Sequence, residues 1–115
     1  MRITGPDVGD QCLGELLRRL DSWPYLGIER RTQRVILRVR DLVVGTLNLE
    51  TRVLSISVPP RSERPLLEGH PEMQGTKDGV QVQVTDLDSR AAAEALLRWR
   101  IALERFAGQL RAASP

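Results

Sequence analysis

The chain has 115 residues, of which 41% are hydrophobic and 28% are charged, and its formal net charge is only +2. This length is enough for one hydrophobic core, so we expect a single domain covering residues 1–115. No apolar run is long enough to cross a bilayer and residues 1–7 lack the apolar core of a signal peptide, so we expect a cytoplasmic protein.

The first predicted element is a helix that begins at Thr4-Gly5-Pro6, because proline suits the first helical position. Ser22-Trp23-Pro24 ends this helix, since the residue before a proline disfavours helical backbone. Cys12 is the only cysteine, which excludes an internal disulfide and a multi-cysteine metal site, and we expect it to be a small buried side chain. The apolar face of the helix consists of Cys12, Leu13, Leu16, Leu17 and Leu20.

Three extended segments with short links follow a turn at 25–27, which predicts an antiparallel meander. Val35, Leu37 and Val39 alternate with a mostly arginine face in the first segment. Gly45 interrupts the second, which suits a central strand with a close approach or a bulge at the glycine. The segments are residues 34–40, 42–49 and 53–58, and residues 28–31 are a candidate edge strand.

A short helix is expected from Ser62 to about Glu68, closed by Gly69, and a polar loop follows over residues 70–79. Residues 80–84 alternate valine with polar side chains, which predicts another strand.

The last predicted helix covers residues 88–113, with acceptors for its first turn at Asp86, Asp88 and Ser89. Arg90–Glu94, Glu94–Arg98 and Arg100–Glu104 are each four residues apart and are expected to form weak ion pairs. Its apolar stripe is Ala92, Leu96, Trp99, Leu103, Phe106 and Leu110.

Leu97 and Ile101 flank that stripe beside Trp99 and widen the apolar arc of the last helix. Such a surplus indicates a partner surface, and a homodimer is the simplest way to bury it. These three residues are therefore candidate partner contacts.

The element order is α-β-β-β-α-β-α. We expect the α+β class, in two layers, with an antiparallel sheet of four to five strands and helices on one face.

His70 is the only histidine and one imidazole can act as a base near neutral pH. Glu68 and Glu72 are close enough in sequence to orient it, but no nucleophile is apparent. His70-Pro71 is more simply explained as a turn residue or a hydrogen-bonded anchor, which we favour. A small-ligand enzyme built around His70 is the third functional hypothesis.

Arg34, Arg38 and Arg40 are expected on one face of the first strand of the meander. Such a row can meet phosphates, so a nucleic-acid or anionic-ligand binder using this strand is the alternative hypothesis. The balanced charge and the lack of a nucleic-acid motif favour a solvated face instead, paired in part with acids of a neighbouring strand such as Glu50.

Metal and cofactor motifs are missing from the sequence. The spacing of Asp78, Asp86 and Asp88 fits no calcium loop, and no glycine-rich phosphate loop, serine elbow or zinc spacing occurs. We therefore expect no cofactor and no catalytic residue.

Several short motifs, in this order, resemble the small bacterial "luciferase-domain" family, which is unrelated to the flavin-dependent luciferase barrel. The resemblance implies a compact α+β unit similar to the MmcQ/YjbR group. The motifs are Ser22-Trp23-Pro24, Val44-Gly45, Val58-Pro59-Pro60, Leu66-Leu67-Glu68-Gly69-His70-Pro71, Asp78-Gly79-Val80 and Ala95-Leu96-Leu97-Arg98-Trp99.

The resemblance also implies histidines beside the glycine of the second strand, where this chain has Gly45-Thr46-Leu47-Asn48. Most of that histidine set is therefore replaced, and the resemblance supports the fold more than an activity. We expect a non-enzymatic binding or regulatory module that acts through protein contacts.

Overall fold

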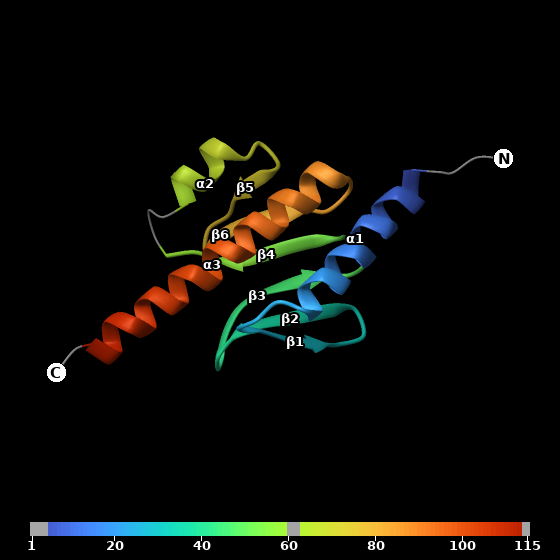
Figure 1. Cartoon of the computed structure of the whole chain (residues 1–115). Coiled ribbons are helices and arrows are strands. Elements are labelled where there is room, and N and C mark those ends of the chain that lie inside the picture. The colour runs from blue at the N-terminus through green and yellow to red at the C-terminus, as the bar shows by residue number, and fades with distance from the viewer. Residues whose placement is uncertain (1–4, 60–62, 114–115) are drawn as a thin grey trace.

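The computed structural model describes residues 5–59 and 63–113. Within them the chain forms three helices and six strands (Figure 1). In chain order these are α1 (Gly5–Asp21), β1 (Leu26–Arg30), β2 (Arg34–Val39), β3 (Leu42–Asn48), β4 (Val53–Ser57), α2 (Glu63–Gly69), β5 (Met73–Gly75), β6 (Gly79–Gln83) and α3 (Leu87–Ala113). Two predicted helix starts, Thr4 and Ser62, lie outside the described residues.

The strands form one sheet in the order β1-β2-β3-β4-β6-β5, and every neighbouring pair is antiparallel. The predicted meander is confirmed as β2-β3-β4, and the candidate edge strand is β1. The additional strand is β5, which lies in the segment predicted to be a loop. With only three residues, β5 is too short to show the alternation that marks a strand in the sequence.

Helices α1 and α3 lie side by side on the same face of the sheet, as Figure 1 shows, while α2 packs beside β5. The expected α+β arrangement is therefore confirmed. The core fills the space between these helices and the sheet, and Cys12 is buried in it as predicted. Its fully buried members include Leu16, Leu20, Leu37, Leu47, Leu54, Ile56, Leu96 and Leu97.

Gly45 lies at a bulge in β3, as expected. Leu37 of β2 faces Gly45, whereas the next residue, Arg38, faces Val43, so Val44 is the extra residue. A Cβ atom on Gly45 would lie 2.3 Å from the carbonyl oxygen of Ser55 on β4. Only glycine allows β3 and β4 to approach this closely.

The side chains of α3 that face the core are centred roughly 100° around the helix axis from the predicted stripe. This rotation corresponds to a shift of about one residue along the sequence. Arg100 is buried at the position where the predicted stripe has Trp99, which is only half-buried. The prediction that Phe106 is buried is wrong, because its side chain is 58% exposed. The side chain of Leu110 lies outside the described residues.

The surplus apolar surface on α3 that suggested a homodimer is also not found at the residues predicted for it. Leu97 is fully buried and Ile101 is only 8% exposed, so both belong to the core of the chain and do not form a surplus apolar surface. The large apolar side chains of α3 that are exposed are instead Leu87 in its first turn and Phe106 in its second half. The C-terminal end of α3 extends past the sheet (Figure 1).

Candidate functional site

A cleft of about 280 Å³ lies between α3 and the turn that follows α1. The turn contributes aromatic rings, and α3 contributes two arginines and an apolar floor. The lining residues are Trp23, Pro24 and Tyr25 from the turn, and Arg98, Ile101, Ala102 and Arg105 from α3.

The turn is built by the end of α1. The backbone N–H groups of Ser22 and Trp23 donate to the carbonyl oxygens of Arg19 and Leu20, which closes the helix before Pro24. Tyr25 then adopts a left-handed backbone with φ of 71°, at a cost of about 1–2 kcal/mol for a residue with a side chain. This strained backbone presents the Tyr25 ring at the surface, where the residue is 57% exposed.

Each aromatic ring of the turn has an arginine of α3 over its face. The Cζ atom of Arg98 is 4.9 Å from the centre of the Trp23 ring, and that of Arg105 is 4.1 Å from the centre of the Tyr25 ring. Stacking uses the flat face of a guanidinium and leaves the N–H donors at its edge available. The two stacks therefore present hydrogen-bond donors on either side of the apolar floor.

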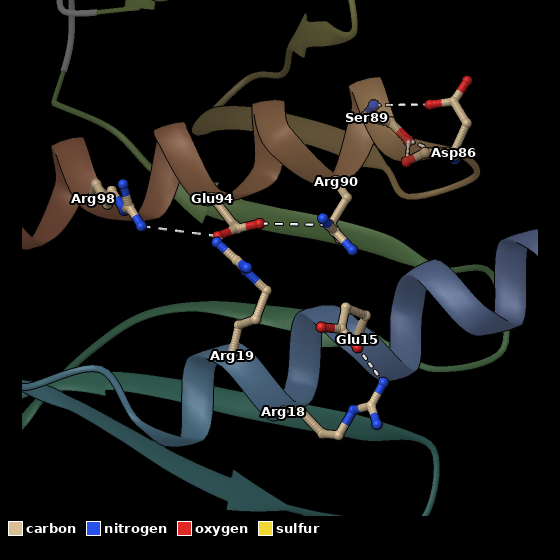
Figure 2. A network of polar contacts seen from close by, with 8 residues as sticks. All are labelled: Glu15, Arg18, Arg19, Asp86, Ser89, Arg90, Glu94 and Arg98. Carbon is tan, nitrogen blue, oxygen red and sulfur yellow. Dashed lines mark hydrogen bonds and ion pairs between the residues drawn. The ribbon is translucent and has the colours of Figure 1, made fainter.

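Arg98 also belongs to a network centred on the buried carboxylate of Glu94 (Figure 2). Glu94 Oε1 accepts a hydrogen bond from Arg19 Nε of α1 at 2.9 Å. Arg90 Nε is 3.6 Å from Oε2, and Arg98 Nη2 is 3.9 Å from Oε1. This network joins the two long helices and holds Arg98 beside the cleft.

Three arginines share this one carboxylate, so the network has a surplus of two positive charges. Arg90 Nε is buried and has no hydrogen-bond partner among the described residues. The predicted ion pairs of α3, Arg90–Glu94, Glu94–Arg98 and Arg100–Glu104, are all present.

His70 lies outside the cleft. It is half-buried between α2 and β5, and its carbonyl oxygen accepts a hydrogen bond from the backbone N–H of Met73 at 3.0 Å. This bond closes a tight turn and supports the interpretation of His70-Pro71 as a turn.

The arginines of β2 do not converge on one point. Arg38 Nη2 is 3.2 Å from Glu29 Oε1, and Arg31 also pairs with Glu29. Arg34 and Arg40 are exposed at opposite ends of the strand, about 20 Å apart along it.

The expected pairing with an acid of a neighbouring strand is present, but the acid that pairs with Arg38 is Glu29 on β1 and not the suggested Glu50. Partial burial acts to raise the pKa of Glu29, but the charges and hydrogen bonds of Arg31 and Arg38 outweigh it and lower that pKa overall.

Asp86 and Asp88 have structural roles at the start of α3. Asp86 Oδ1 accepts a hydrogen bond from the backbone N–H of Ser89 at 2.8 Å, as expected at a helix start, and Asp88 lies in the first turn of α3.

In the part of the chain that the structure describes, no three histidine, cysteine or acidic side chains gather as a metal site would require. Nor does any helix in this part have the length and apolarity to cross a membrane.

The cleft was not predicted from the sequence, because residues 25–27 have the pattern of a plain turn and Arg98 that of an ion-pair partner. A signal was present, because Arg98 and Arg105 are seven residues apart and therefore lie on one face of the helix, two turns from each other. What the sequence does not give is the position of the Trp23 and Tyr25 rings opposite that face.

Comparisons with protein-family models, with curated proteins and with solved structures find no match to this chain. The resemblance to the small "luciferase-domain" family stays a prediction.

Proposed function

We propose that this chain is a non-enzymatic binding module that contacts protein partners through the cleft. The observation that supports this most is the pair of stacks, Arg98 on Trp23 and Arg105 on Tyr25, on either side of an apolar floor. Tryptophan, tyrosine and arginine are the residues that contribute most of the energy at protein interfaces.

The size of the cleft favours a protein partner over a cofactor. Its volume of about 280 Å³ is just below the usual range of ligand pockets, which is about 300–1,000 Å³. A nucleotide needs more enclosed space than this, whereas one or two side chains of a docked segment fit.

The strain at Tyr25 supports the same proposal. A non-glycine residue with φ of 71° is energetically unfavourable, and such residues cluster at functional sites. An exposed aromatic ring held in this way adds little to the core, so its benefit is expected in binding.

Peptide selection tests the proposal. A random peptide library is selected on the wild-type chain, and the enriched peptides are titrated against Tyr25→Gly, which removes the ring and suits the left-handed backbone. We expect affinity to fall at least tenfold. Leu87→Ala is the control, because Leu87 is exposed on α3 but does not line the cleft. Failure to enrich any peptide, or equal affinity of both variants, would overturn the proposal.

We also propose a homodimer, with Phe106 as its contact in place of the contacts that the sequence suggested. This residue is 58% exposed on the extended end of α3, and it lies one helical turn from Ala102 of the cleft. Light scattering on the wild type and on Phe106→Ser tests this arrangement. A monomeric wild type at high micromolar concentration would exclude it.

A further inference from the structure

The acids around the cleft are already engaged. Glu94 is bonded to Arg19 at 2.9 Å, which leaves Arg98 at 3.9 Å from the same oxygen. Asp21 pairs with Arg30 at 3.1 Å, and Glu104 pairs with Arg100 at 2.6 Å.

Arg105, stacked on Tyr25, has no carboxylate partner among the described residues. The cleft thus has more cationic donors than its own acids can satisfy. A site with such an excess favours an incoming anion.

The spacing of the donors restricts the shape of that anion. Arg98 and Arg105 are seven residues apart on α3, which is about 10 Å along a helix. A peptide in the polyproline II conformation covers about the same distance in three residues, since it advances by about 3.1 Å per residue, and its three residues per turn return the side chain to the same face. Two acidic side chains three positions apart therefore match the two arginines.

The floor between the arginines requires apolar contact. Ile101 and Ala102 lie there, bordered by the rings of Trp23 and Tyr25. A phosphate group or a nucleic-acid backbone would contact the arginines and leave this floor uncovered, whereas a peptide with apolar residues between its acids covers both.

We infer, given the proposed function, that the occupant of the cleft is a protein segment in the polyproline II conformation with two acidic residues three positions apart and apolar residues between them. Arg98 and Arg105 each bind one carboxylate, and the apolar side chains pack on Ile101 and Ala102.

Calorimetric titration of three capped peptides tests this inference, with the central sequences Glu-Leu-Leu-Glu, Gln-Leu-Leu-Gln and Glu-Ser-Ser-Glu. We expect the first to bind at least tenfold more tightly than either of the others. Arg105→Gln is expected to weaken the first peptide but to leave the Gln-Leu-Leu-Gln peptide unchanged. Arg64→Gln, an exposed arginine on α2, is the charge-matched control and is expected to change neither.

Each alternative result has a distinct meaning. Equal affinity for the glutamate and glutamine peptides would overturn the carboxylate inference. The proposed function would still hold if the peptide selection enriched peptides that lack acidic residues. Tighter binding of a short single-stranded DNA than of the Glu-Leu-Leu-Glu peptide would overturn both. A helical circular dichroism spectrum equal to that of the wild type establishes that Arg105→Gln is folded.

Discussion

Arg100 of α3 donates from Nε to the carbonyl oxygen of Ser57, 2.8 Å away at the end of β4. Its Nη1 donates to Glu104 Oε1 at 2.6 Å, one turn further along the helix. Burying a guanidinium costs free energy unless the group is hydrogen-bonded, and the buried Arg100 guanidinium makes both of these hydrogen bonds. The bond to Ser57 connects α3 to β4 and restricts the rotation of α3 on the sheet, with Arg98 and Arg105 toward the turn after α1.

Replacing Arg100 by methionine keeps an unbranched side chain but removes both bonds. The Ser57 carbonyl then loses a partner, so we expect the free energy of unfolding to fall by about 1–3 kcal/mol. Urea unfolding measures this, and Arg18→Met is the control, since Arg18 is exposed and its replacement should change stability by no more than about 0.5 kcal/mol. An equal, small effect of both replacements would show that Arg100 does not anchor the helix.

The strands of the sheet were easier to predict from the sequence than the rotation of α3. Alternation was enough to predict β2 and β4, because each of them buries one face, and the short links predicted β3 between them. The stripe of α3 was misplaced because Arg100 counts as polar in any hydrophobic pattern, although a hydrogen bond to Ser57 lets it lie in the core. Binary patterning cannot anticipate a buried polar side chain whose partner is a backbone atom of a distant strand.

The candidate site was harder to predict for a related reason. Its residues come from two segments that are more than 70 positions apart in the sequence, with Trp23 and Tyr25 in one and Arg98 and Arg105 in the other. Tyr25 adopts a left-handed backbone although it is neither glycine nor asparagine, the residues that usually mark such a position in a sequence.

Gly45 provides the next test. Adding a methyl group there places it 2.3 Å from the Ser55 carbonyl oxygen and 2.5 Å from Ile56 Cδ1. Because one of these is a backbone atom, β3 and β4 must separate, and we expect Gly45→Ala to destabilise the fold by about 1–3 kcal/mol. Gly14→Ala is the matched control.

Gly14 lies within α1 and no heavy atom would lie within 4 Å of its new methyl group. Since alanine favours helix, this replacement is expected to stabilise the protein by up to about 1 kcal/mol. Thermal or urea unfolding of the pair compares the two directly. The same sign of effect at both positions would contradict the close approach at Gly45.

The start of α3 predicts a pH dependence. Hydrogen bonds from the backbone and the side chain of Ser89 lower the pKa of Asp86 from its ordinary value of 3.8, against a smaller opposing effect of burial. A lowered pKa in the folded state means that Asp86 contributes stability fully above pH 3.8 and loses it as the pH falls through the folded-state pKa.

Asp86→Asn removes this titration and keeps a side-chain oxygen as an acceptor. We expect the wild type to be the more stable protein near pH 6, and the difference to shrink as the pH falls from about 4 to about 2. Urea unfolding at a series of pH values measures it. A difference that stays constant across this range would mean that the charge of Asp86 does not contribute.

The arginines at the ends of β2 test the alternative function. If the chain bound nucleic acid through this strand, Arg34→Gln with Arg40→Gln would weaken retention on heparin strongly, and wild-type binding would fall steeply with salt. We expect instead that this double variant elutes at the same salt concentration as Arg18→Gln with Arg64→Gln, which removes equal charge elsewhere. The reason is geometric: Arg38 is paired with Glu29, and Arg34 and Arg40 lie too far apart to act together. Earlier elution of the β2 variant alone would favour the nucleic-acid hypothesis over the cleft.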